Sequence, residues 1–177
     1  MDRRKILALI LAVIAATVLG LFVWQMVRHG RETSAIERMP SIVLKDLDGA
    51  DFDTGSLSGT GRGTVIICFS PDCDFCGMES EEIVMNHQRL SGCNLLFVTP
   101  AQEDEVFSFL SDHPIDAIPG VKILMDLSGK FFRTFSVTAP PVCLIYDEQM
   151  RLSARHKGVI SVDQIIDLMD NGQKNHK

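Results

Sequence analysis

The segment from residue 64 to residue 99 restricts the fold more than any other part of the chain. It begins with the apolar, largely β-branched run TVIICFS (64–70), passes through a helical pattern over residues 73–90, and ends in a second apolar run, NLLFVT (94–99). Continuous apolar runs of this length are typical of strands buried on both faces of a sheet. Because the connection is long enough to hold a crossover helix, the two strands are predicted to be parallel.

The flanking segments predict a larger sheet. Residues 41–57 contain Asp48-Gly49, which favours a tight turn between two strands and so an N-terminal β-hairpin. Further strands are predicted at VKILMD (121–126), VCLIYD (142–147) and RLSARHKG (151–158). We therefore expect one α/β domain, in which a mixed sheet is flanked by helices.

Capping patterns predict where the other helices begin. Thr99 and Gln102 match a capping box, with Pro100 at the first helical position, and indicate a helix directly after the second buried strand. Ser161 and Gln164 match the same pattern and predict the start of the last helix. A short helix or turn is expected at GKFFRTF (129–135).

The N-terminal segment has the pattern of a membrane anchor. Three basic residues at positions 3–5 precede an uncharged, mostly apolar run over residues 6–27, and about 20 helical residues span a bilayer. A cleaved signal peptide is the rival interpretation, although its apolar core is usually shorter. We expect residues 1–27 to be a single uncleaved transmembrane helix, residues 28–40 a polar linker, and residues 41–177 the folded domain.

Charge bears on orientation and partners. The basic cluster at the very N-terminus favours an N-terminus on the cytoplasmic side, which would put the domain on the extracytoplasmic (periplasmic) side of the cytoplasmic membrane.

The chain has a net charge of −6, which argues against nucleic acid as a partner, because nucleic acid would demand a basic surface. Residues 41–177 carry 11 basic and 20 acidic residues. Anionic lipid should repel such a domain, so the anchor must supply the membrane attachment.

Cys73 and Cys76 form a C-x-x-C at the junction between the first buried strand and the helix that follows it. A structural zinc site usually takes two close ligand pairs, and this chain has only one, with scattered histidines. A static disulfide that closes so short a loop would contribute little stability. A redox-active pair fits the position best, because a helix N-terminus stabilises a thiolate on the first cysteine while the second lies one turn inside the helix.

At these motifs the chain resembles the membrane-anchored, thioredoxin-like thiol–disulfide oxidoreductases of the TlpA/ResA type, within the redoxin group. The hairpin VLKDLDGADF is similar to the extra N-terminal hairpin of that family, and SPDCDFC stands where the family has its W-C-x-x-C motif. The resemblance covers residues 40 to about 170 and implies a thioredoxin-like fold.

The resemblance also implies roles for individual residues. Cys73 would attack a substrate disulfide and Cys76 would resolve the mixed disulfide, so that a Cys73–Cys76 disulfide is left behind. Glu79 matches a glutamate that assists proton movement, and Pro141 matches the cis-proline beside the substrate groove. No prosthetic group or metal is implied.

The chain departs from the family at several positions. Asp72 stands where tryptophan is usual, Asp74 and Phe75 replace Gly-Pro between the cysteines, Ile67 replaces the buried aspartate of thioredoxins, and Pro140 precedes the cis-proline. Two carboxylates beside Cys73 disfavour a thiolate, so the pair is expected to act as a disulfide reductant. Its partners would be disulfide-containing proteins and a membrane electron donor, and its substrate is left open.

Two questions remain beside this interpretation. A thioredoxin-like domain could also be a non-catalytic module that binds copper or a partner, for which His87 and His113 are the histidine candidates. Cys68 and Cys143 are expected to be small buried apolar residues, with a second disulfide between them as an alternative if their strands are neighbours. Cys93 is expected to be a half-buried residue at the entry of a strand.

Overall fold

The computed structural model describes residues 13–14, 16–22, 24 and 36–174. Residues 36–177 belong to one compact unit, and the N-terminal segment belongs to another. Within the described residues, no helix is long and apolar enough to cross a membrane. The predicted span over residues 6–27 falls largely outside them, so the anchor stays a prediction.

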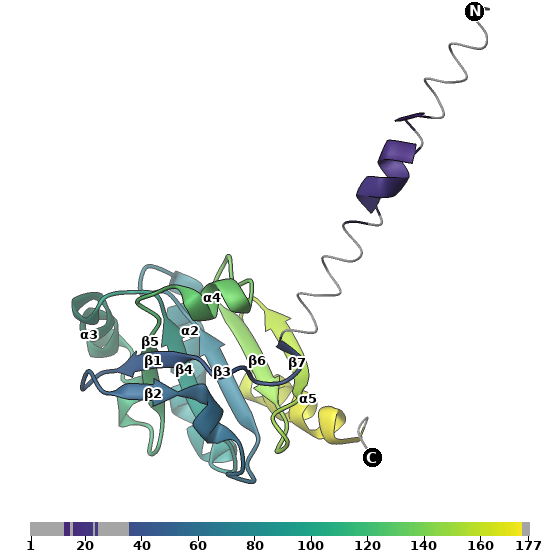
Figure 1. Ribbon diagram of the computed structural model, residues 1–177. Helices are drawn as coiled ribbons and strands as arrows, with labels where there is room; N and C mark the ends of the chain where they lie inside the picture. The colour runs from purple at the N-terminus through teal and green to yellow at the C-terminus, as the bar shows by residue number, and fades with distance from the viewer. Residues whose placement is uncertain (1–12, 15, 23, 25–35, 175–177) are drawn as a thin grey trace, which may run out of the picture. The chain divides into compact units, whose positions relative to one another are not determined.

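A seven-stranded mixed sheet forms the centre of the compact unit, as predicted, in the order β2-β1-β5-β4-β3-β6-β7 (Figure 1). Strands β3, β4 and β5 are parallel, and β1, β6 and β7 join their neighbours in antiparallel pairs. The bounds are β1 (Val43–Asp46), β2 (Asp51–Asp53), β3 (Thr64–Cys68), β4 (Asn94–Thr99), β5 (Lys122–Met125), β6 (Val142–Tyr146) and β7 (Leu152–Lys157).

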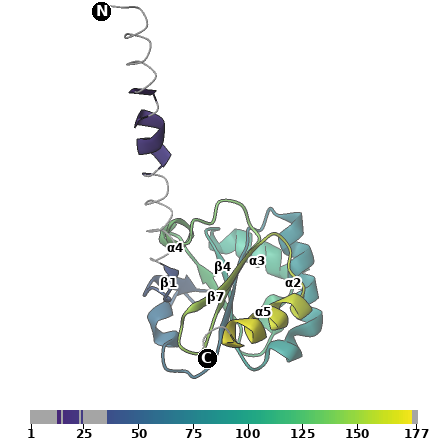
Figure 2. The same cartoon turned by 90° about the vertical axis from the view of Figure 1, so that its right-hand side faces the viewer.

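Helices cover both faces of the sheet. Figure 2 shows α2, α3 and α5 on one side of the sheet and α4 on the other. The helices are α2 (Asp74–Asn86), α3 (Glu103–Asp112), α4 (Lys130–Thr134) and α5 (Val162–Lys174), and short 3-10 turns follow β2, α2 and α3. Each parallel pair of strands is joined through a helix on the same face, so the carboxyl ends of β3, β4 and β5 meet at one edge.

The side chains of the central strands alternate between two cores. Val65, Ile67 and Cys143 face the core under α2, α3 and α5, whereas Ile66 and Cys68 face the core under α4. Cys68 is paired with Val142 across β3 and β6, so Cys68 and Cys143 point to opposite faces of the sheet. The strands are neighbours, but the alternative of a disulfide between these two cysteines is wrong.

The N-terminal hairpin is present and lies at the β5 edge of the sheet. Strands β1 and β2 pair through the turn at Asp48-Gly49, where Gly49 has a φ of 76° that favours glycine. Strand β1 then pairs with β5, so the hairpin extends the sheet by two strands.

The folded unit begins earlier than the polar composition of residues 28–40 indicated. Ile36 and Met39 are buried, and the Tyr146 hydroxyl donates a hydrogen bond to the Ile36 carbonyl at 2.7 Å. The backbone N–H of Met39 also donates to Met150, at 2.9 Å. Residues 36–40 therefore belong to the domain, which does not start at residue 41 as predicted.

The start of α3 also differs from the prediction. Its N-cap is Gln102, and the side chains of Gln102 and Glu105 form the reciprocal capping box. Thr99 is the last residue of β4, where it pairs with Met125, so its backbone is extended and belongs to the sheet. The predicted cap of α5 is confirmed, since the Gln164 backbone N–H donates to the Ser161 hydroxyl at 3.3 Å.

Candidate active site

Cys73 lies at the carboxyl end of β3 and forms the N-cap of α2. Its backbone is extended, and its sulfur accepts a hydrogen bond from the backbone N–H of Cys76 at 3.2 Å. Asp72 precedes the N-cap and lies outside the helix. Cys73 is partly exposed, and its sulfur lies at the N-terminus of the helix, where the first backbone N–H groups have no partner within the helix.

Cys76 has a different environment, although it follows only one turn later. Its side chain is 1% exposed and packs in the core under α2, and all five cysteines are free thiols in the structure. Burial raises the pKa of the Cys76 thiol well above its ordinary value, and the neighbouring Cys73 raises it further. The two thiols therefore differ in access to solvent, with the first open to a partner and the second enclosed.

Glu79 lies one turn beyond Cys76 on the same face of α2 and is fully buried. Its Oε1 accepts a hydrogen bond from the backbone N–H of Ile160 at 3.1 Å. Its Oε2 has no hydrogen-bond partner among the described residues. Burial raises the pKa of Glu79 to about 7, and the bond from Ile160 offsets part of this shift.

Pro141 lies opposite Cys73, at the start of β6. The Pro140–Pro141 peptide bond is cis, as the resemblance implied, and the Sγ of Cys73 lies 3.7 Å from the Pro140 carbonyl oxygen. Ile67, at the position of the buried aspartate of thioredoxins, is fully buried in the core under α2.

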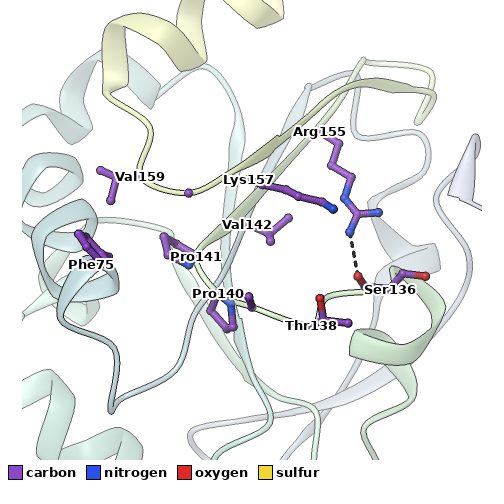
Figure 3. A pocket seen from close by; sticks show the side chains of 11 residues that line it. Phe75, Ser136, Thr138, Pro140, Pro141, Val142, Arg155, Lys157 and Val159 are labelled. Atoms are coloured by element: carbon purple, nitrogen blue, oxygen red, sulfur yellow. Dashed lines mark hydrogen bonds between the residues drawn. The ribbon is translucent and has the colours of Figure 1, made fainter.

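A groove of about 490 Å³ runs from the first turn of α2 past these prolines to β7. Figure 3 shows Phe75 and Val159 at one end, Pro140 and Pro141 in the middle, and Arg155 at the other end. Arg155 donates a hydrogen bond to the Ser136 carbonyl at 3.0 Å. The groove thus passes Pro140, whose carbonyl oxygen contacts the Cys73 sulfur, and changes from apolar to cationic along its length.

The two histidines named as candidate copper ligands make their contacts with residues other than Cys73 and Cys76. His87 ends α2, and its Nδ1 lies 2.8 Å from the Val84 carbonyl oxygen. His113 stacks on Phe109, with ring centroids 4.6 Å apart, and its imidazole packs against Gly77. Within the residues that the structure describes, no group of three or more His, Cys, Asp or Glu side chains is arranged to hold a metal ion.

Sequence reasoning brought Cys73, Cys76, Glu79 and Pro141 together, and the structure places all four around the start of α2. It missed the partners of these residues. The backbone N–H of Ile160 carries no side-chain signal, so the sequence could not reveal its bond to Glu79. The residues of β7 that line the groove were predicted only to form a strand. The signal that could have found them is the Arg155–Lys157 alternation on a strand that follows the cis-proline.

Comparison with known proteins supports the fold. No protein-family model and no curated protein sequence matches the chain. Among solved structures, DsbF of MTB is similar with a TM-score of 0.65 and 21% identity, over 78% of this chain and 96% of that one. The domain has a thioredoxin-like fold.

Two further structures show the same thioredoxin-like fold. One is a secreted Mycobacterium tuberculosis disulfide oxidoreductase homologous to E. coli DsbE, with a TM-score of 0.60 and 18% identity over 80% of this chain and 98% of that one. The other is StoA from Bacillus subtilis, with a TM-score of 0.58 and 15% identity over 73% of this chain and 96% of that one. Identities this low support a shared fold, so the chemistry has to be argued from the site.

Proposed function

We propose that this chain is a thiol–disulfide oxidoreductase that reduces disulfide bonds of protein substrates by exchange at Cys73 and Cys76. The observation that carries the proposal is the unequal exposure of the two thiols on the first turn of α2. Cys73 is partly exposed, and its sulfur accepts a hydrogen bond from the Cys76 N–H, whereas Cys76 is buried. Dithiol exchange requires this arrangement of an accessible attacking thiol and a shielded resolving thiol.

The exchange has two steps. The Cys73 thiolate attacks one sulfur of the substrate disulfide, so that a mixed disulfide forms and the other substrate sulfur leaves as a thiolate. Cys76 then loses its proton and attacks the Cys73 sulfur, which releases the second substrate thiolate and leaves a Cys73–Cys76 disulfide. Two electrons pass from the protein to the substrate.

Glu79 is placed to take the proton from Cys76 in the second step. The Cys76 thiol has a raised pKa and needs a base, and Glu79 lies one turn away with one buried carboxyl oxygen unpaired among the described residues. A pKa of about 7 lets this carboxyl group accept and return a proton at neutral pH. Pro141 and the groove would hold the substrate segment beside Cys73.

The setting proposed for this activity is the outer side of the cytoplasmic membrane. It is supported by the apolar run over residues 6–27 and by the basic cluster that precedes it. The role as a reductant is supported by the two aspartates beside Cys73. A reductant at that location needs a membrane electron donor that restores the dithiol after each turnover.

Single cysteine variants test the mechanism. Cys73→Ser should abolish the reduction of a protein disulfide, and Cys76→Ser should accumulate a mixed disulfide at Cys73 that mass spectrometry detects. Cys93→Ser is the matched control, because Cys93 is a buried thiol away from the start of α2. A Cys73→Ser protein with full reductase activity would exclude the mechanism. A correctly folded dithiol that exchanges with no disulfide, but binds copper stoichiometrically, would favour the binding module.

A further inference from the structure

The groove beside Cys73 has chemically different ends. Its apolar end is formed by Phe75 and Val159, whose side chains are 63% and 40% exposed although they are large and apolar. Its other end is lined by Arg155 and Lys157, which are two residues apart on β7 and so lie on the same face of the strand. Figure 3 shows both cationic side chains at the side of the groove away from Phe75.

The two prolines remove backbone donors from the rim of this groove. Pro140 and Pro141 have no N–H, so two successive residues on its rim lack a donor. The Pro141 carbonyl is already used, because the Gly158 N–H donates to it at 2.9 Å. The Pro140 carbonyl oxygen accepts from the Cys73 Sγ at 3.7 Å, and its second lone pair can accept an N–H from an extended segment. An extended substrate segment can therefore form only a few backbone hydrogen bonds with this rim, and side chains have to supply the rest of the recognition.

The opposite flank of Cys73 carries the opposite charge. Helix α3 joins β4 to β5, on the other side of β3 from β6 and β7. The pocket between the start of α2 and α3 has five carboxylates in its lining, those of Asp72, Asp74, Asp104, Glu105 and Asp112. An acidic side chain of a substrate is attracted to the β7 flank and repelled from the α3 flank.

We propose that the domain selects extended protein segments in which an acidic residue lies on one particular side of the reacting cysteine, with Lys157 and Arg155 as the residues that recognise it. The inference rests on the proposed function, since the segment is the substrate of Cys73. The acidic flank makes the choice directional, because the same residue on the other side of the cysteine meets carboxylates.

Binding of unreactive peptides tests this preference. Three short peptides carry serine in place of the reacting cysteine, and they have no acidic residue, an aspartate before the serine, or an aspartate after it. Fluorescence anisotropy with the full chain measures their affinities at low ionic strength. One aspartate peptide should bind about threefold to tenfold more tightly than the neutral peptide, and the other more weakly. Added salt should remove both differences.

A charge reversal with a matched control identifies the recognising residue. Lys157→Glu should abolish the gain from the favoured aspartate. Lys122→Glu should preserve it, because Lys122 is an exposed lysine that begins β5, at the end of the parallel strands away from Cys73. Equal affinities for the three peptides, or a gain that survives Lys157→Glu, would overturn the inference.

Reduction of hydroxyethyl disulfide separates the two hypotheses. This compound has no charge for Lys157 or Arg155 to attract, so its Cys73-dependent reduction tests the proposed function alone. Tighter binding of one aspartate peptide than of the other, without this reduction, would support the groove preference and contradict the exchange activity. Reduction with equal binding of the peptides would support the exchange activity and contradict the groove preference.

Discussion

The buried carboxyl group of Glu79 accepts a hydrogen bond from the backbone N–H of Ile160 at 3.1 Å. Glu79 belongs to α2, and Ile160 lies in the segment that leads into α5. The bond joins the helix that carries the cysteines to the C-terminal helix on the same face of the sheet. One oxygen of the carboxyl group is satisfied and the other has no partner among the described residues, and this environment favours the neutral acid.

The first prediction concerns stability and pH. Glu79 has a pKa of about 7 in the folded protein and an ordinary pKa of 4.5 in the unfolded chain, so between these values the unfolded chain binds fewer protons than the native one. The free energy of unfolding should therefore fall as pH rises from 4.5 to 7, by up to about 3 kcal/mol from this group, and then level off. Urea denaturation at pH 5 and pH 8 measures the change.

Glu79→Gln is the control for that measurement. Glutamine keeps an oxygen acceptor for the Ile160 N–H but has no charge to desolvate. The variant should lose this part of the pH dependence and be more stable than the wild-type protein at pH 8. If the free energy of unfolding changed equally with pH in both proteins, the Glu79 carboxyl group would already be ionised at low pH in the folded protein.

A second prediction concerns the proton transfer by Glu79. Glu79→Gln should slow the resolution of a Cys73 mixed disulfide by about 100-fold at pH 7, because no general base remains beside Cys76. The first step should keep its rate, since Cys73 attacks without this carboxyl group. Stopped-flow measurement of substrate thiol release separates the steps, and equal slowing of both would argue against the role.

A third prediction follows from the contact between Gly77 and His113. A β-carbon at position 77 would lie 2.7 Å from the His113 Nε2, so Gly77→Ala should cost about 1–3 kcal/mol of stability. In a His113→Ala background the same change should stabilise the protein by about 0.5–1 kcal/mol, because alanine is the better helix former. A double-mutant cycle by denaturant unfolding measures the coupling, and additive effects would contradict the contact.

A fourth prediction concerns the start of the domain. A protein that begins at residue 41 should be less stable by about 3 kcal/mol than one that begins at residue 36, because it lacks the buried Ile36 and Met39. Tyr146→Phe should cost the longer protein about 1 kcal/mol and the shorter protein nothing, since its hydroxyl donates to Ile36. Thermal unfolding of the four proteins gives both differences.

A fifth prediction is the reduction potential of the Cys73–Cys76 pair. Equilibration against glutathione and dithiothreitol buffers should give a value near or below about −220 mV, the range of reducing thioredoxin-like proteins. A value near about −120 mV would indicate an oxidant and would contradict the role assigned to Asp72 and Asp74.

The sheet was predictable because its strands leave a strong local signal. Residues 64–68 and 94–99 are apolar without interruption, and the structure buries β3 and nearly all of β4. The start of α3 was less predictable, since Thr99/Gln102 has the usual Ser/Thr-x-x-Glu/Gln pattern of a capping box, whereas the structure uses Gln102 and Glu105. The pairing of Thr99 with Met125 in the sheet decides between them, and this contact is not local.

The site was only partly predictable for a similar reason. Cys76, Glu79 and Ile83 have the helical spacing of one face, which could have indicated that Glu79 is buried, but the neighbouring Glu81 and Glu82 suggested an exposed acidic run. Residues 36–39 show no apolar alternation. They pack on the domain through Tyr146 and Met150, which are more than 100 positions away in the chain.

The placement of Cys68 and Cys143 on opposite faces of the sheet has a consequence for the protein as it matures. Five thiols offer many wrong pairings to a chain that meets an oxidant, and incorrect bonds would have to be repaired by an isomerase. In the folded domain the sheet itself is a barrier between these two sulfurs, and Cys93 donates its S–H to the Leu90 carbonyl within a separate turn. Oxidation after folding should therefore produce no bond between Cys68 and any cysteine of the opposite core, which leaves fewer incorrect isomers for an isomerase to repair.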